Sequence, residues 1–255
     1  MRLKKFFNLR RIVRKGKILL LAYDQGIEHG PTDFDDRNVD PAYVIDIAAK
    51  GGFTGLVLHK GVAEKYYDEI KKAKVPLVLK LNGKTSLVKG DPISRQIATI
   101  DEAVDLGACA VGYTIYIGSF HEEEMLSEVS KIQAEAHRRG LPLIVWVYPR
   151  GAGLEDIPKN ELMSYATQVA LSIGADIVKI HPEGNMKDFA WAVKSAGRVK
   201  VICAGGGKVS EGKLLEKIKG YMENGASGMA IGRNVWQAKE PLELAGKIRD
   251  IVWAK

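Results

Sequence analysis

One lysine, Lys179, lies in the middle of a short apolar segment, 176–180, of the kind that forms a buried parallel strand. Burial disfavours the charged ammonium form, so it lowers the pKa of a lysine and leaves a neutral amine near neutral pH. A neutral amine is the nucleophile that forms a Schiff base with a ketone. The strand pattern is equally compatible with a lysine at the strand end whose ammonium group reaches solvent.

Other polar side chains stand at the ends of predicted strands in the same way. Asp24 follows the apolar segment 17–23, and Tyr148 ends the segment 143–148. A lysine can form an iminium that accepts the electrons of a breaking C–C bond, while a phenol and a carboxylate move the protons. The set Lys179, Tyr148 and Asp24 therefore predicts aldol chemistry through a Schiff base.

Two glycine-containing loops indicate a phosphate site. One follows the predicted strand 199–204, and the other follows the predicted strand 228–231. Glycines expose backbone N–H groups and an arginine adds a fork-shaped cation, so two such loops after successive strands can hold an anion. The residues that we expect to bind substrate are Gly205, Gly206, Gly207, Gly232 and Arg233, with Arg150 and Lys80 as further cations at strand ends.

Metal-dependent aldol chemistry would need a cluster of histidine and acidic ligands. The five histidines are scattered without ligand spacing, so we expect no metal and no other cofactor. The two cysteines, Cys109 and Cys203, fall in predicted strands and fit small core residues of a reducing compartment. These features predict a cytoplasmic enzyme that needs no metal.

The elements that must position these residues form a repeating pattern. Short apolar segments alternate with segments of helical period, and each strand is followed by a helix or by a loop and a helix. This predicts a single-domain α/β fold, the (β/α)8 TIM barrel, with its active site at the C-terminal ends of the strands. A doubly wound sheet is the rival, but it would stop at fewer strands. The predicted strands are 17–23, 55–59, 76–81, 109–114, 143–148, 176–180, 199–204 and 228–231, and the predicted helices are 41–50, 62–72, 101–106, 122–139, 160–173, 186–196, 211–224 and 241–253.

The positive charge of the chain is concentrated in an N-terminal arm, residues 1–16, ahead of the barrel domain, residues 17–255. The net charge is +7, yet residues 1–17 hold eight Lys or Arg and no acid, so the remainder is nearly neutral. A basic amphipathic helix could lie on a membrane or on nucleic acid. We favour packing of its apolar stripe on the domain or on a neighbouring subunit. We expect no nucleic-acid partner, because the rest of the chain has no interleaved aromatics, RNA-binding motif or zinc spacing. We expect no membrane partner, because no apolar run approaches the roughly 18 residues of a membrane span.

Several long motifs resemble one family, the archaeal-type class I fructose-1,6-bisphosphate aldolases. The similarity extends over residues 17–251, and the motifs that carry it are LAYDQGIEHGP at 21–31, GVAEKYY at 61–67, KLNGKT at 80–85, VGYTIY at 111–116, WVYPRG at 146–151 and IGRNVWQ at 231–237. The resemblance implies a metal-independent lyase that cleaves a phosphorylated sugar, and a homo-oligomer, a decamer of two pentameric rings.

The resemblance also implies roles for single residues. Lys179 corresponds to the Schiff-base lysine, Asp24 to the acid of the first strand, Tyr148 to the proton-transferring tyrosine and Trp146 to its catalytic neighbour. The loops 205–207 and 232–233 match the phosphate site.

Three positions depart from the family pattern. Gln25 stands where a histidine is frequent, Ala204 where a serine is frequent, and residues 180–184 replace a Tyr-Thr-Gly ending. The alternative readings are a related Schiff-base aldolase or transaldolase, such as 2-amino-3,7-dideoxy-D-threo-hept-6-ulosonate synthase, a non-catalytic phosphosugar-binding barrel, and a scaffold that holds nucleic acid with its arm. The segment 27–31 favours the bisphosphate aldolase.

Overall fold

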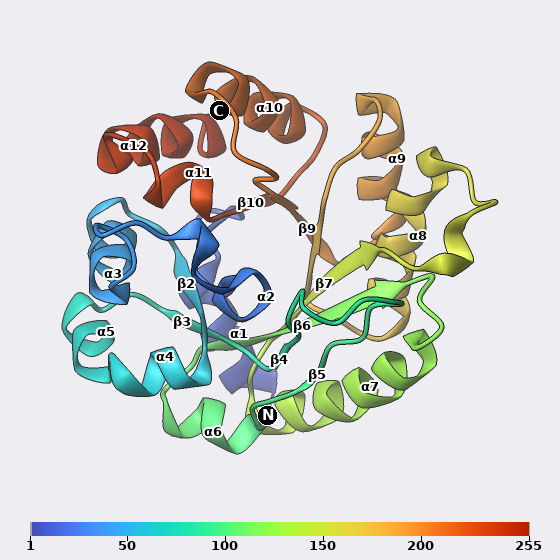
Figure 1. Ribbon diagram of the computed structural model, residues 1–255, viewed down its shortest axis with the longest axis horizontal. Helices are drawn as coiled ribbons and strands as arrows, with labels where there is room; N and C mark the ends of the chain where they lie inside the picture. The colour runs from blue at the N-terminus through green and yellow to red at the C-terminus, as the bar shows by residue number, and fades with distance from the viewer. Residues whose placement is uncertain (1, 255) are drawn as a thin grey trace.

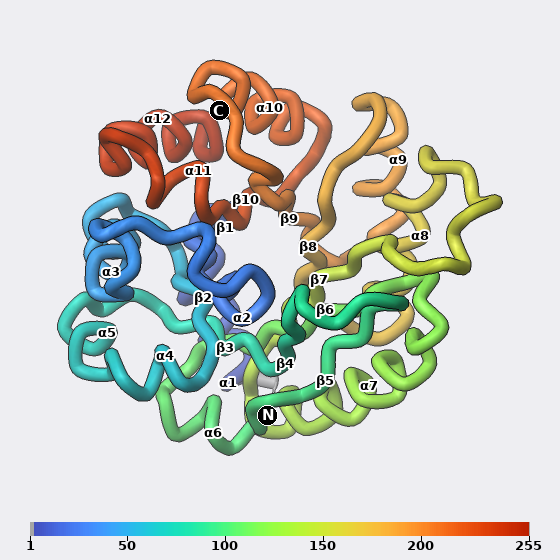
Figure 2. Tube along the Cα trace, in the orientation of Figure 1, coloured from blue at the N-terminus to red at the C-terminus, as the bar shows by residue number. Residues whose placement is uncertain are grey.

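Eight parallel strands close into a barrel in the order β1, β10, β9, β8, β7, β6, β3, β2 (Figure 1). The computed structural model describes residues 2–254. Each strand pairs with the next along the chain, and β1 closes the ring against β10 (Figure 2). The predicted (β/α)8 barrel is therefore confirmed. The barrel strands are β1 (Ile18–Ala22), β2 (Gly55–His59), β3 (Leu77–Lys80), β6 (Ala110–Ile117), β7 (Leu143–Pro149), β8 (Ile177–Ile180), β9 (Lys200–Ala204) and β10 (Gly228–Ile231).

A ring of helices surrounds the strands (Figure 1). Their starts follow local chemistry: the Asp40 side chain accepts a hydrogen bond from the amide of Ala42 at 3.0 Å, and Thr99 forms a capping box with Glu102. The predicted helix 62–72 is wrong in one respect, because it is broken at Tyr66 into two helices. The outer helices are α3 (Pro41–Lys50), α4 (Lys60–Lys65), α5 (Tyr67–Ala73), α6 (Ile100–Asp105), α7 (Glu122–Arg139), α8 (Lys159–Ser172), α9 (Met186–Ser195), α10 (Glu211–Glu223) and α12 (Pro241–Val252).

Several short elements occur where the sequence predicted only loops. All of them follow the C-terminal ends of barrel strands, so they build the rim of the barrel. Short segments like these carry too few residues for a periodic pattern and form because the surrounding fold holds them. They are α2 (Gly26–His29), η1 (Gly30–Asp33), β4 (Asn82–Gly83), β5 (Arg95–Gln96), η2 (Ala152–Leu154) and α11 (Arg233–Trp236).

The strands separate two apolar layers. Alternate residues point into the barrel, where Leu20, Ile144 and Ile177 belong to one buried cluster, or outward to the helices, as Val178 does. Cys109 and Cys203 are both buried and free, as predicted. This alternation decides which polar side chains reach the barrel interior.

Helix α1 (Arg2–Ile12) lies behind the barrel in Figure 1, at the end opposite the rim. Ile12 is fully buried and joins the interior cluster, with Leu9 packed beside it. The first half of the apolar stripe is exposed: Phe6 is 50% exposed and Phe7 57%. The arm therefore packs on the barrel by its C-terminal half. No helix within residues 2–254 has the length and apolar character needed to cross a membrane.

A charged network ties α1 to the barrel. The Asp176 carboxylate accepts hydrogen bonds from Lys5 Nζ at 2.7 Å, His137 Nε2 at 2.8 Å and the amide of Leu143 at 3.0 Å. Burial alone would raise the pKa of Asp176, but these hydrogen bonds and the charge of Lys5 bring that pKa below its ordinary value. A carboxylate with a lowered folded pKa stabilises the protein above its ordinary pKa, and that stability is lost as the pH falls through the folded value.

We expect Asp176→Asn to lower the free energy of unfolding at pH 7 by about 1–3 kcal/mol, because a partly buried charged hydrogen-bond partner is lost. The measurement is urea unfolding at pH 7 and at several values below pH 4. The difference between variant and wild type should shrink in acid, where the native carboxylate is itself protonated. An unchanged difference at every pH would show that the carboxylate charge contributes nothing.

Candidate active site

A pocket of about 290 Å³ opens at the C-terminal ends of the barrel strands. Every residue that the sequence placed in the site lines it, and each of the eight barrel strands or the loop after it contributes. The predicted residues brought together there are Asp24, Lys80, Trp146, Tyr148, Arg150, Lys179, Gly205, Gly206, Gly207, Gly232 and Arg233.

Lys179 is buried inside the barrel. It follows Ile177, an interior residue, by two positions on β8, and its side chain is therefore directed inward. Only 7% of the residue is exposed, so the alternative of a solvated strand end is wrong. Burial lowers the pKa of Lys179, although the charges of Asp24 and Glu28 oppose the shift. The lysine has the electrostatic setting of an amine nucleophile.

A second buried lysine, Lys80, lies beside the indole ring of Trp146, and Lys179 lies beside the same ring. Lys80 Nζ lies 5.5 Å from the centre of the Trp146 ring, and Lys179 Nζ lies 5.2 Å from it. Burial lowers the pKa of Lys80 to about 8, against the opposing charge of Asp24. Lys80 donates to the carbonyl of Asn82 at 2.9 Å and to its Oδ1 at 3.1 Å, whereas Lys179 donates to no acceptor in the described chain. Of the two lysines, Lys179 is the one whose amine is free to react.

Asn82 holds this wall of the pocket and was not recognised as important from the sequence. It is fully buried, and its amide group donates to the carbonyls of Ser94 at 2.9 Å and Thr114 at 2.8 Å. Its Oδ1 also accepts from the amide of Thr114 at 2.8 Å. This set of hydrogen bonds joins β4 to β6 and fixes the acceptors of Lys80.

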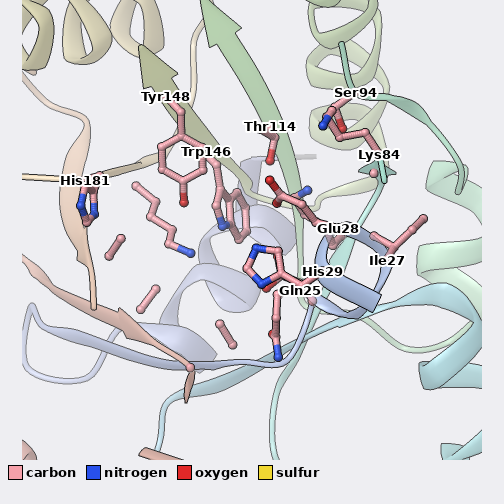
Figure 3. Close-up of a pocket in the computed structure, with 18 of the residues that line it drawn as sticks. Gln25, Ile27, Glu28, His29, Lys84, Ser94, Thr114, Trp146, Tyr148 and His181 are labelled. Carbon is pink, nitrogen blue, oxygen red and sulfur yellow. The ribbon is translucent and has the colours of Figure 1, made fainter. Parts of the chain in front are cut away.

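Trp146 and Tyr148 point from β7 into the cavity, facing Glu28 and His29 of the first loop (Figure 3). The Trp146 ring fits because residue 112 is glycine: a Cβ there would lie 2.3 Å from the indole. Trp146 Nε1 is buried and has no hydrogen-bond partner among residues 2–254. A buried donor without an acceptor is available to a ligand.

Tyr148 lies among charged groups. Burial raises the pKa of its phenol, and the carboxylates of Asp24 and Glu28 raise that pKa further against the opposing charge of Arg150. The Arg150 guanidinium stands 5.3 Å from the centre of the Tyr148 ring and 3.4 Å from Glu28 Oε1. Tyr148 therefore keeps its proton at neutral pH and can donate it. Glu28 was not predicted as a site residue from the sequence, because the helix on which it lies, α2, is too short to show a periodic pattern.

The two glycine loops meet through Asn234, a buried residue that the sequence did not single out. Its Nδ2 donates to the carbonyls of Gly205 at 3.2 Å and Gly207 at 3.1 Å. The carbonyls of Gly205 and Gly207 therefore accept hydrogen bonds from Asn234. The amides of Gly206 and Gly207 donate to no acceptor in the described chain. These amides and Arg233 line the same pocket, an arrangement compatible with a phosphate site, and the phosphate site itself stays a prediction.

The described residues, 2–254, contain no group of three or more His, Cys, Asp and Glu side chains placed to hold a metal ion. Of the histidines in the pocket, His59 Nε2 is 3.2 Å from the carbonyl oxygen of Asn82, and His29 Nδ1 is 2.5 Å from Asp33 Oδ2. These rings are engaged by single hydrogen-bond partners of the protein.

Comparisons with known proteins agree with this geometry. A family model described as DeoC/LacD family aldolase matches residues 18–238. The chain is 47% identical over 248 residues to the class 1 fructose-bisphosphate aldolase of Thermoproteus tenax, covering 96% of this chain and 93% of the relative. It is 29% identical to the 2-amino-3,7-dideoxy-D-threo-hept-6-ulosonate synthase of Halobacterium salinarum, over 96% of this chain and 89% of the relative.

The fold also matches a solved archaeal fructose-1,6-bisphosphate aldolase whose catalytic lysine is covalently bound to the carbinolamine intermediate of the substrate. The TM-score is 0.91 at 44% sequence identity, and the match covers 98% of this chain and 100% of that chain.

We expect Gly112→Ala to displace the Trp146 indole and to lower the free energy of unfolding by about 1–3 kcal/mol, because the added methyl overpacks the barrel interior. Near-ultraviolet circular dichroism and urea unfolding measure the two effects. Gly61→Ala is the matched control: Gly61 lies in helix α4 with open space around it, so a stabilisation of about 0.5–1 kcal/mol is expected there. Equal effects at both sites would contradict the tight fit.

Proposed function

Because this chain belongs to the DeoC/LacD family of aldolases, we propose that it is a class I, Schiff-base-forming fructose-1,6-bisphosphate aldolase. The reaction is the reversible cleavage of fructose 1,6-bisphosphate to dihydroxyacetone phosphate and glyceraldehyde 3-phosphate. The observation that carries the proposal is the amine of the buried residue Lys179, which has no hydrogen-bond partner in the described chain and lies beside Trp146 in a pocket at the barrel rim.

Lys179 supplies the electron sink. Its neutral amine attacks the C2 ketone of the open-chain sugar, and loss of water from the carbinolamine gives an iminium. When the C3–C4 bond breaks, its electron pair moves to C3 and is delocalised onto the iminium nitrogen as an enamine. Hydrolysis of the final iminium releases dihydroxyacetone phosphate and restores the lysine.

Two proton transfers accompany the bond cleavage. Asp24 takes the proton of the C4 hydroxyl, so that C4 leaves as the aldehyde of glyceraldehyde 3-phosphate. Tyr148 then donates its phenolic proton to C3 of the enamine. Burial and the neighbouring carboxylates keep the tyrosine protonated until this step. Trp146 places its unpaired indole N–H in the same cavity, where it can bind an oxygen of the substrate.

The phosphates bind to cations and amides on opposite parts of the rim. The loops 205–207 and 232–233 hold one phosphate, with Arg233 as the charged partner. Arg150, just after β7, is the cation for the second phosphate, and Lys80 is a further cation in the pocket wall. This arrangement suits a sugar with a phosphate at each end.

The nearest rival is a related aldolase or transaldolase that builds an amino-dideoxy-heptulosonate. The higher identity to the class 1 fructose-bisphosphate aldolase, 47% against 29%, favours the bisphosphate sugar. A non-catalytic phosphosugar-binding barrel would not need the free amine of Lys179. A homo-oligomer, decameric by resemblance, and a cytoplasmic location remain predictions, as does the division into residues 1–16 and 17–255.

Borohydride reduction in the presence of fructose 1,6-bisphosphate should inactivate the enzyme and attach the sugar to Lys179 alone, because reduction traps the iminium. Peptide mapping by mass spectrometry locates the adduct. Lys80→Gln should still give the adduct at Lys179, and Lys179→Gln should give none. An adduct on Lys80 in the wild-type protein would overturn the assignment of the nucleophile.

Tyr148→Phe should lower kcat by about 10²–10⁴-fold with little change in KM, because the lost hydroxyl acts only while protons move. Steady-state kinetics in the cleavage direction measure both constants. The variant should still be trapped by borohydride, since Lys179 is intact. A variant that kept its kcat would exclude Tyr148 as the proton donor.

A further inference from the structure

Arg233, the cation of the glycine loops, has an acidic partner in the first loop of the barrel. Its Nη1 lies 3.1 Å from Oδ1 of Asp33, which stands at the end of η1. The other oxygen of the same carboxylate, Oδ2, lies 2.5 Å from Nδ1 of His29. Arg233 and His29 both line the pocket, whereas Asp33 is not among its lining residues. The carboxylate of Asp33 thus contacts both Arg233 and His29 from outside the pocket lining.

Contacts of the backbone of Asp33 and of the next residue hold Asp33 in place. Its carbonyl accepts a hydrogen bond from Gln237 Nε2 at 2.6 Å, and the amide of Gln237 donates to the carbonyl of Arg233 at 3.0 Å. Phe34, the next residue, packs on Trp236 with 5.8 Å between the ring centres. The segment that carries Asp33 is therefore held against α11, the segment that carries Arg233.

An acid at this place could have either of two opposite effects on an anion. Its negative charge repels a phosphate and competes for the guanidinium, which would weaken binding. Alternatively, it holds a long, flexible side chain in one rotamer and leaves the remaining N–H groups of the fork directed to the pocket, which would strengthen binding by removing the cost of ordering the side chain.

The geometry favours the second effect. Only Nη1 of Arg233 contacts Asp33, so most of the guanidinium fork remains available to a ligand. The other oxygen of the carboxylate is hydrogen-bonded to His29, and only 15% of the Asp33 side chain is exposed. Burial alone would raise the pKa of Asp33, but the hydrogen bond from His29 and the charge of Arg233 bring that pKa below its ordinary value, so the acid is ionised at neutral pH.

We propose that Asp33 is a positioning residue of the phosphate site, holding Arg233 in the orientation that binds the phosphate, while His29 holds the other oxygen of the Asp33 carboxylate. Identification of that phosphate as part of the sugar rests on the proposed function. The binding of a phosphate anion itself does not, because it depends only on Arg233 and the glycine loops.

Asp33→Asn tests the proposal, since it keeps the shape of the side chain and removes its charge. Isothermal titration calorimetry with inorganic phosphate should show affinity weakened roughly 10-fold, as the loss of an outer partner of a ligating group does elsewhere. KM for fructose 1,6-bisphosphate should rise by a similar factor with kcat nearly unchanged. The matched control is Asp36→Asn, an exposed acid on the same loop, which should bind phosphate as the wild type does.

A double-mutant cycle separates positioning from a general structural role. In the Arg233→Ala background, Asp33→Asn should cause no further loss of phosphate affinity, because the side chain that it positions is gone. Additive losses, an unchanged affinity in the single variant, or tighter binding would each overturn the proposal, and tighter binding would identify Asp33 as a competitor for Arg233.

Two further measurements distinguish a loss of positioning from a loss of folded structure. Thermal unfolding checks that Asp33→Asn remains folded, and Asp33→Ala, which removes both contacts, should weaken phosphate binding at least as much. Calorimetry with inorganic phosphate needs no turnover. If borohydride traps no adduct, the aldolase function fails while the result for Asp33 stands.

Discussion

The site depends on the contact of one indole ring with two buried lysines. Trp146 fills the centre of the barrel rim, and the amines of Lys80 and Lys179 lie about equally far from its ring. The ring provides a polarisable surface for cations but no hydrogen-bond acceptor, so it tolerates an ammonium without neutralising it. The difference between the lysines is therefore set by Asn82, which binds Lys80 and leaves Lys179 unpaired. One asparagine thus occupies the amine of Lys80, and the amine of Lys179, the proposed nucleophile, is left without a partner in the described chain.

The first loop of the barrel connects the opposite sides of the pocket. Glu28 lies against Arg150 at the end of β7, and Asp33 lies against Arg233 after β10. Both acids lie on two short helices that together occupy residues 26–33. The loop thus pairs each proposed phosphate-binding arginine with a carboxylate, and the two arginines differ in exposure: the Arg150 side chain is 57% exposed and that of Arg233 is 31% exposed. The less exposed arginine, Arg233, suits the proposed site for one end of the sugar, because burial strengthens its interaction with an anion.

The sequence was sufficient to predict the barrel, which follows from periods of two and about 3.6 residues, and to select polar residues at strand ends that line the pocket, although their roles stay predictions. It was not sufficient to predict the partners of those residues. Asn82 and Asn234 act through hydrogen bonds to segments distant in the chain, which no local pattern contains. The end of the fourth predicted strand was also wrong, because β6 continues to Ile117. Within β6, Tyr113 belongs to the outer layer, where its hydroxyl donates to Glu128 of α7, and the next residue, Thr114, lines the pocket.

The polar groups that the fold leaves unsatisfied are concentrated at the same place. Within residues 2–254, the buried side-chain atoms without a hydrogen-bond partner are Trp146 Nε1 and Gln25 Nε2, and both residues line the pocket. Such a group costs about 1–3 kcal/mol when nothing binds it. The opposite end of the barrel shows the contrary pattern, since the carboxylate of Asp176 is shared by Lys5, His137 and the amide of Leu143. The carboxylate at the N-terminal end is thus fully paired, whereas Trp146 and Gln25, the latter a departure from the family pattern, leave donors at the C-terminal end that a ligand can bind.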